Sequence, residues 1–209
     1  SEAGLKRSID KVFEILVYAL FSTIVRALRL QITIELAQPD SRMIASFGDF
    51  LVKVVGMKED GSKFVLPGSM FRLGATNASD RGLDIATNFG PAIQVKHLTL
   101  DEEEMSDIFD GITADHVVIV CKDAHKDRVE GLVRQLSLEG KLRGFVTLGD
   151  IERWYGACLN EYPKSLGRTL LEDLYREFTT EFPSVENLRP FMEDRGYAKS
   201  LLPEGWSIE

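Results

Sequence analysis

The chain has 209 residues, of which 44% are hydrophobic and 28% are charged, and its net charge is −8. This length supports one substantial core with a small appendage, and the composition is that of a globular protein. The longest apolar run, residues 15–25, is interrupted by Ser22 and Thr23 and is too short to cross a bilayer, so we expect no membrane partner. The acidic balance argues against a protein that coats nucleic acid through its phosphates, although basic residues can still line a local groove.

The cysteines and histidines exclude several kinds of site. Cys121 and Cys158 lie far apart and form no CxxC pattern, so neither a disulfide framework nor a zinc site is expected, and a reduced, cytoplasmic location follows. His97, His116 and His125 show neither metal-ligand spacing nor an HNH pattern, which argues against that class of nuclease.

The first half of the chain begins with a helix. Ser8 is expected to cap it, and it is apolar on nearly every side as far as about residue 29, which is typical of a buried helix. An alternating strand is predicted over residues 31–36 and an amphipathic helix over residues 43–55. Two short strands at 63–66 and 70–73 follow.

The second half alternates strands and helices. A polar loop leads into a β-hairpin at about 83–96, and a helix containing six acidic residues follows at 101–110. The apolar run 115–121 is typical of a strand that is covered on both faces. A helix at 124–138 and a strand at 144–148 complete the alternation.

After Asp150 the pattern becomes helical, and Pro163 separates a helix at 151–162 from a second one. The second helix has Leu166, Leu170, Leu174 and Phe178 on one stripe. We therefore predict an α/β fold with a mixed β-sheet flanked by helices. Residues 1–150 would form its core, and residues 151–209 a helical extension packed on that core.

The hairpin carries polar residues at a spacing of two. Residues two apart on a strand share a face, so Gln94 and Lys96 point the same way. A turn through residues 89–91 would pair Asn88 with Ala92, Ala86 with Gln94 and Asp84 with Lys96. Asp84, Gln94 and Lys96 would then share one face.

The remaining residues of the hairpin would form the opposite, core-facing side: Leu83, Ile85, Ile93 and Val95. A carboxylate, an amide oxygen and an ammonium on one strand face are suited to a divalent metal and a phosphate. The pattern therefore predicts the site of a metal-dependent nuclease.

The order of the elements resembles the core of the PD-(D/E)xK nucleases, in which a helix precedes a hairpin-bearing mixed sheet. Several segments are also similar to HaeII-type type II restriction endonucleases. These segments are GLKRSIDKVFE (4–14), TNASDRGLD (76–84), NFGPAIQVKHL (88–98) and ADHVVIVCKD (114–123). The likeness spans most of the chain and is strongest over residues 72–123. It corresponds to the carboxy-terminal catalytic part of such enzymes, since family members are longer at the amino terminus.

The resemblance implies Mg²⁺-dependent hydrolysis of double-stranded DNA at a short GC-rich site. It also implies a homodimer, because twofold symmetry matches palindromic sites. Asp84 would be the metal-bridging acid, and Gln94 would stand where Glu is more common and offer a neutral oxygen. Lys96 would orient or deprotonate the attacking water or neutralise charge on the phosphate, and the carbonyl of Val95 would be a further metal ligand.

Each of these residues has a plainer interpretation. Asp84 can end a turn, Asp80 competes with it for the acid role, and Gln94 and Lys96 can lie on a solvated strand face. Glu14 lies among apolar residues and either faces the metal site or forms a structural salt bridge.

Two residues of the polar loop are candidates for contacts with DNA. Asn77 and Arg81 suit phosphates or base edges but can equally belong to a surface loop. Two other functions stay open: a repair or RecB-like nuclease on the same fold, and a non-catalytic α/β DNA-binding module.

Overall fold

The computed structural model describes residues 2–38, 40–58, 61–73, 83–96, 116–135 and 139–182. Five strands form one mixed sheet in the order β3-β4-β5-β6-β7. Strand β4 (Ile85–Thr87) is antiparallel to both of its neighbours, β3 (Met70–Arg72) and β5 (Ala92–Val95). Strands β6 (Val117–Cys121) and β7 (Leu142–Thr147) continue the sheet from β5 in parallel.

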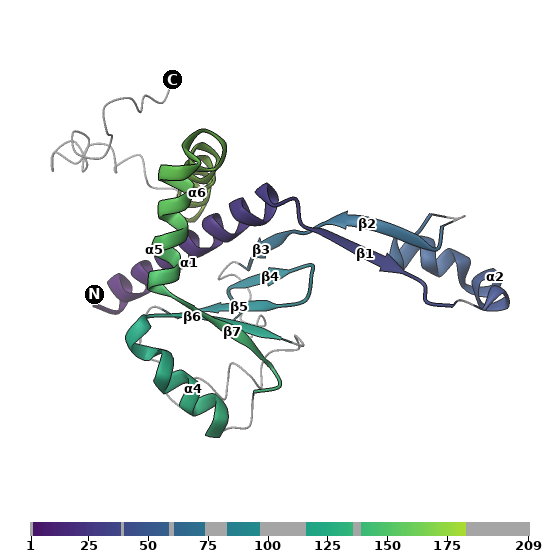
Figure 1. The fold of residues 1–209 in the computed structure, drawn as a ribbon, viewed down its shortest axis with the longest axis horizontal. Helices are drawn as coiled ribbons and strands as arrows, with labels where there is room; N and C mark the ends of the chain where they lie inside the picture. Colours follow the sequence, from purple (N-terminus) through teal and green to yellow (C-terminus); the bar gives the residue numbers. More distant parts are fainter. Residues whose placement is uncertain are drawn as a thin grey trace.

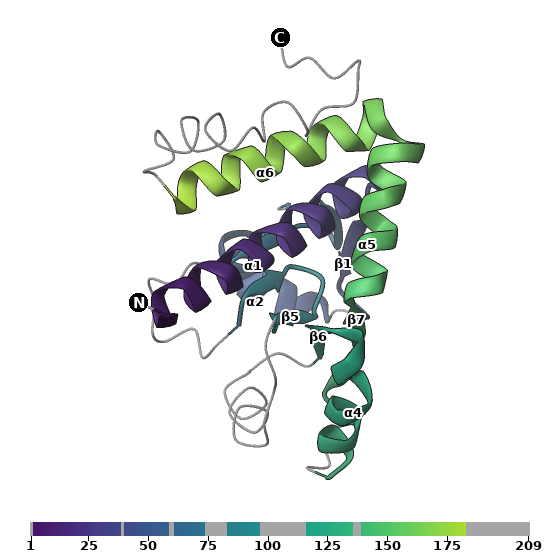
Figure 2. The ribbon, with the colours of Figure 1, turned by 90° about the vertical axis from the view of Figure 1, so that its left-hand side faces the viewer.

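Helices cover both faces of this sheet (Figures 1 and 2). Helices α1 (Glu2–Ala27), α5 (Leu148–Gly156) and α6 (Arg168–Glu181) lie on one side, and α4 (Lys126–Gln135) lies on the other. The predicted α/β architecture, a mixed sheet flanked by helices with a helical carboxy-terminal region, is therefore confirmed. Among the helices of the described residues, none has the length and apolar content that a membrane crossing requires.

Two hydrophobic clusters hold the layers together. The first joins α1, α5 and α6 to the sheet through side chains that include Val17, Leu20, Ile85, Val120 and Leu170. All five are fully buried. The second cluster joins α4 to the other face of the sheet through β5 and β6. Because β5 and β6 are covered on both sides, their apolar runs do not alternate, as expected for inner strands.

Several predicted boundaries were wrong. Helix α1 begins at Glu2, so Ser8 lies within the helix and does not cap it. The helix predicted from residue 124 is a short 3₁₀ turn (Asp123–His125) followed by α4, and β7 begins two residues earlier than predicted. Helix α5 begins sooner than predicted because Thr147 and Asp150 form a capping box at its amino terminus.

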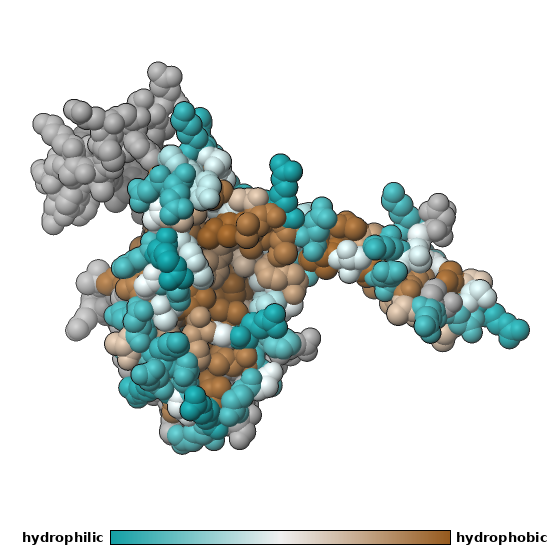
Figure 3. All heavy atoms as spheres, in the orientation of Figure 1, coloured by the Kyte–Doolittle hydropathy of each residue, from teal (hydrophilic) through white to brown (hydrophobic). Residues whose placement is uncertain are grey.

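A hairpin arm projects from the body (Figure 1). It consists of β1 (Gln31–Glu35) paired with β2 (Lys63–Pro67), and of helix α2 (Ser41–Phe50) with the π-helical segment η1 (Leu51–Val55). The predicted amphipathic helix is present, but α2 has no buried residue. Four of its apolar side chains are exposed: Met43, Ile44, Phe47 and Phe50. Figure 3 shows hydrophobic surface along the arm.

The register of the central hairpin differs from the prediction. Ile85 pairs with Ile93, which places Asp84 opposite Gln94 rather than opposite Lys96. The turn is centred at Phe89, one residue earlier than predicted; the Thr87 hydroxyl donates to the carbonyl of Pro91, and Gly90 has a φ of 116°. A shift of two residues leaves every strand residue on its predicted face. Leu83 is outside the strand and packs with the α4 cluster, so its predicted place beside Ile85 was wrong.

Candidate active site

Asp84 is held in place at the start of β4 by hydrogen bonds through its backbone and side chain. Its carbonyl accepts from the Leu73 N–H at 2.9 Å, and its own N–H donates to the Ile93 carbonyl at 3.3 Å. Its Oδ2 atom accepts from the Val95 N–H and from Gln94 Nε2, each at 2.7 Å. Strands β3 and β5 therefore fix the position and direction of this carboxylate.

Gln94 is buried rather than solvated. It is 2% exposed, so the interpretation of Gln94 as a surface residue was wrong. Its Nε2 contacts Asp84, but its Oε1 atom is buried and has no hydrogen-bond partner among the described residues. An unsatisfied buried acceptor costs about 1–3 kcal/mol. The Gln94 Oε1 atom can therefore bind a hydrogen-bond donor or a cation, next to the Asp84 carboxylate.

The surroundings of Asp84 disfavour its charged form. Burial raises the pKa of this carboxyl to about 7, although the hydrogen bond from Val95 lowers it. The negative charge of Glu14 raises the pKa further, and the ammonium groups of Lys96 and Lys11 lower it. A bound cation would favour the ionised carboxylate in the same way as these ammonium groups, and more strongly.

Lys96 follows β5 directly. Its N–H donates to the Val120 carbonyl at 2.9 Å, which continues the parallel ladder and fixes where the side chain starts. The effect of its ammonium on the pKa of Asp84 shows that the two charges interact. The structure thus brings Asp84, Gln94 and Lys96 together from adjacent strands, and their catalytic roles remain predictions.

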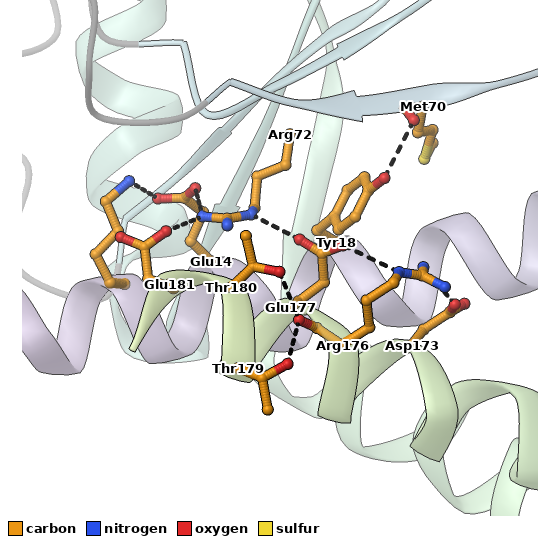
Figure 4. Close-up of polar contacts among 11 residues, drawn as sticks. Glu14, Tyr18, Met70, Arg72, Asp173, Arg176, Glu177, Thr179, Thr180 and Glu181 are labelled. Carbon is orange, nitrogen blue, oxygen red and sulfur yellow. Dashed lines mark hydrogen bonds and ion pairs between the residues drawn. The ribbon is translucent and has the colours of Figure 1, made fainter. Parts of the chain in front are cut away.

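Glu14 approaches this group from α1 and is 4% exposed. Its Oε2 lies 2.6 Å from Lys11 Nζ, and its Oε1 lies 3.2 Å from Arg72 Nη1 (Figure 4). Glu14 is therefore in a structural salt bridge, its charge also acts on Asp84, and its place at a metal site stays a prediction. The sequence analysis missed Arg72, which lies 58 residues away from Glu14 and has no local signal. Lys11 was detectable, since it is one helical turn from Glu14.

The structure does not test the other candidates. Asn77, Asp80, Arg81 and His97 lie outside the described residues. Val95 contacts Asp84 through its N–H, and the role of its carbonyl as a metal ligand stays a prediction.

The donor set fits a hard divalent cation. Within the described residues, no group of three or more His, Cys, Asp and Glu side chains is placed to hold a metal. The oxygens here are instead a carboxylate and an unpaired amide oxygen. Mg²⁺ favours oxygen ligands, takes few carboxylates and keeps several waters, and a carboxylate with an amide oxygen is compatible with that preference.

The profile of the HaeII restriction endonuclease family matches residues 1–197. The chain belongs to this family. It is 41% identical over 200 residues to the type II restriction enzyme NgoBI of Neisseria gonorrhoeae, across 94% of this chain and 56% of that enzyme. It is 38% identical over 203 residues to the type II restriction enzyme HaeII of Haemophilus aegyptius, across 96% of this chain and 58% of that enzyme.

The chain therefore spans a little over half the length of these curated relatives. No solved structure matches it. The resemblance noted from the sequence is confirmed at the level of the family, and the fold is consistent with that of restriction endonucleases.

Proposed function

We propose that this chain is the catalytic part of a type II restriction endonuclease that hydrolyses phosphodiester bonds of double-stranded DNA with Mg²⁺, at a short GC-rich site. The observation that carries the proposal is the buried contact between Asp84 and Gln94. It leaves an amide oxygen unpaired beside a carboxylate, within the electrostatic reach of Lys96. Because the chain belongs to a family of restriction endonucleases, we expect the substrate of this site to be DNA.

Asp84 and Gln94 would hold the cation. A bound Mg²⁺ would lower the pKa of its water and stabilise negative charge on the phosphate. Asp84 contributes in its ionised form, and its hydrogen bond from Val95 keeps the carboxylate in one orientation. Gln94 now directs its Nε2 atom toward Asp84. A 180° rotation of the side-chain amide would direct Oε1 toward Asp84 and toward a cation bound there.

Lys96 would act on the phosphate or on the attacking water. Its ammonium carries the positive charge that a phosphate gaining negative charge requires, and a fixed charge in a buried site acts more strongly than one in water. Because the backbone of Lys96 is bound to β6, the side chain starts from a rigid position.

We also propose that residues 1–150 form the nuclease core and residues 151–209 a helical extension on it. We expect a homodimer, since two copies related by twofold symmetry can each cut one strand of a palindromic site. A cytoplasmic location suits a chain whose two cysteines, Cys121 and Cys158, are free. Sedimentation velocity with and without a cognate DNA duplex measures the oligomeric state.

Plasmid cleavage tests the function. Purified protein with Mg²⁺ should produce discrete fragments whose mapped ends share one sequence. Lys96→Met should lose cleavage and keep its fold by circular dichroism. Lys63→Met is the matched control, because Lys63 lies on the arm with its side chain 54% exposed, and it should cut normally.

The pattern of products separates this function from its alternatives. Progressive loss from DNA ends would indicate a repair or RecB-like nuclease. Intact plasmid with folded protein across several divalent metals would contradict an enzyme and favour a DNA-binding module.

A further inference from the structure

Arg72, the last residue of β3, is the centre of a buried ion-pair cluster (Figure 4). Its side chain is 9% exposed. The Nη1 atom lies 3.2 Å from Glu14 of α1 and 2.8 Å from Glu181 of α6, and Nε lies 3.1 Å from Glu177 of α6. One guanidinium thus joins a strand of the sheet to two helices.

Arg72 is the cation that joins all three carboxylates, although Glu14 also pairs with Lys11 and Glu177 with Arg176. Burial alone would lower the pKa of Arg72, but hydrogen bonds to Glu181 and Glu14 and the charges around it raise the pKa above its ordinary value, so the group stays charged. Its planar fork can donate to several carboxylates at once, which a lysine ammonium cannot do with the same geometry. Without Arg72, Glu14, Glu177 and Glu181 would be like charges close together and poorly solvated, which is strongly unfavourable.

Arg72 is also connected to the candidate active site through the backbone. It pairs with Ile85 in the sheet, and the next residue, Leu73, donates its N–H to the carbonyl of Asp84. Through its side chain it holds Glu14, whose charge acts on Asp84. The backbone next to Arg72 therefore binds the Asp84 backbone, and the Arg72 side chain binds Glu14, whose charge acts on Asp84.

We propose that Arg72 is a positioning residue for cleavage: its guanidinium fixes the Glu14 carboxylate at the end of β3, where the next residue, Leu73, binds the Asp84 backbone, and Glu177 and Glu181 hold the guanidinium. This inference rests on the proposed function. It gives α6 a part in the active site, since two carboxylates near its end fix the cation that fixes Glu14. A displaced Glu14 would change the charge and geometry around Asp84 without contacting DNA.

A second ion-pair cluster offers a matched control. Arg26 of α1 pairs with Asp173 of α6, which also accepts a hydrogen bond from Thr23 and pairs with Arg176. This cluster also joins α1 to α6, but it lies about three helical turns along α1 from Glu14. Arg26→Gln therefore makes the same chemical change as Arg72→Gln, but at a site that is distant from Asp84.

Single-turnover cleavage and DNA binding, measured together, test the proposal. Arg72→Gln should lower the rate constant of cleavage by about tenfold or more, because misplacing a group beside the reacting atoms slows the chemical step. The Kd for DNA should stay within about threefold, since the lost contact does not bind substrate. Arg72→Lys should recover part of the rate, and Arg26→Gln should cut at the unaltered rate.

A double-mutant comparison, in which Arg72 is replaced in a variant that already lacks the Glu14 charge, shows whether Arg72 acts through Glu14. In Glu14→Gln, the further change Arg72→Gln should reduce the rate much less than it does alone. The proposal is overturned if Arg72→Gln cuts at the unaltered rate, or if its effect is as large in the Glu14→Gln background. It is also overturned if Arg26→Gln slows cleavage equally. Should Arg72→Gln fail to fold, Arg72→Lys decides, because an unaltered rate in that variant contradicts the proposal.

The two proposals can fail separately. If the unaltered chain does not cut DNA, the proposed function is wrong. The free energy of unfolding then tests the link between Arg72 and Glu14 by itself. Non-additive effects of Arg72→Gln and Glu14→Gln in urea denaturation support the link, and additive effects overturn it.

Discussion

Replacing Asp84 with asparagine should stabilise the metal-free protein at high pH while abolishing cleavage. The amide oxygen of the variant can still accept the hydrogen bonds from the Val95 N–H and from Gln94 Nε2. The substitution therefore removes the charge of residue 84 and keeps most of its contacts. Its effect on stability reports the cost of holding an ionised carboxylate in this site.

The magnitude follows from the pKa of Asp84, which burial raises from 3.8 to about 7. Between these pH values the folded protein holds a proton that the unfolded chain has released. The free energy of unfolding of the unaltered chain therefore falls as the pH rises from about 4 to about 7, and Asp84 contributes no further change above that. At about 1.4 kcal/mol per pKa unit, ionised Asp84 costs at most about 4 kcal/mol.

Urea denaturation with a chelator present is the assay. The stability advantage of Asp84→Asn over the unaltered chain should grow by roughly 2–3 kcal/mol between about pH 5 and about pH 8. Adding Mg²⁺ at the higher pH should raise the Tm of the unaltered chain but not that of the variant. An advantage that is equal at both pH values would show that Asp84 titrates normally, and would refute the reasoning.

Three further substitutions test the site and the packing around it. Gln94→Glu replaces the Nε2 donor with a second carboxylate at Asp84, so it should destabilise the metal-free protein at about pH 8 and enlarge the rise in Tm on adding Mg²⁺; an unchanged Mg²⁺ response would argue against a cation here. Leu170→Ala opens the fully buried contact of α6 with the core and should cost about 2–5 kcal/mol in urea denaturation. Thr147→Ala removes the capping box of α5 and should cost about 1 kcal/mol by the same measurement, whereas no loss would show that the cap is dispensable.

The amino-acid sequence was sufficient for the order of the elements that the structure describes and for the shared face of the polar hairpin residues; the predicted acidic helix at 101–110 lies outside the described residues. Gln94 and Lys96 are two apart, and this spacing holds in any register. The predicted pairing of Asp84 with Lys96 was wrong by two residues, because the turn is centred at Phe89 rather than at Gly90. An even shift preserves faces, so Asp84 still meets Gln94.

The tertiary structure alone decided what surrounds these residues. Local periodicity records which face of an element is apolar, and it carries no information about which distant segment covers that face. Glu14 is joined by Arg72, and Arg72 by Glu181 at a separation of 109 residues, so no local pattern could reveal either partner. For the same reason the sequence predicts an amphipathic helix at α2, although none of the residues of α2 is buried.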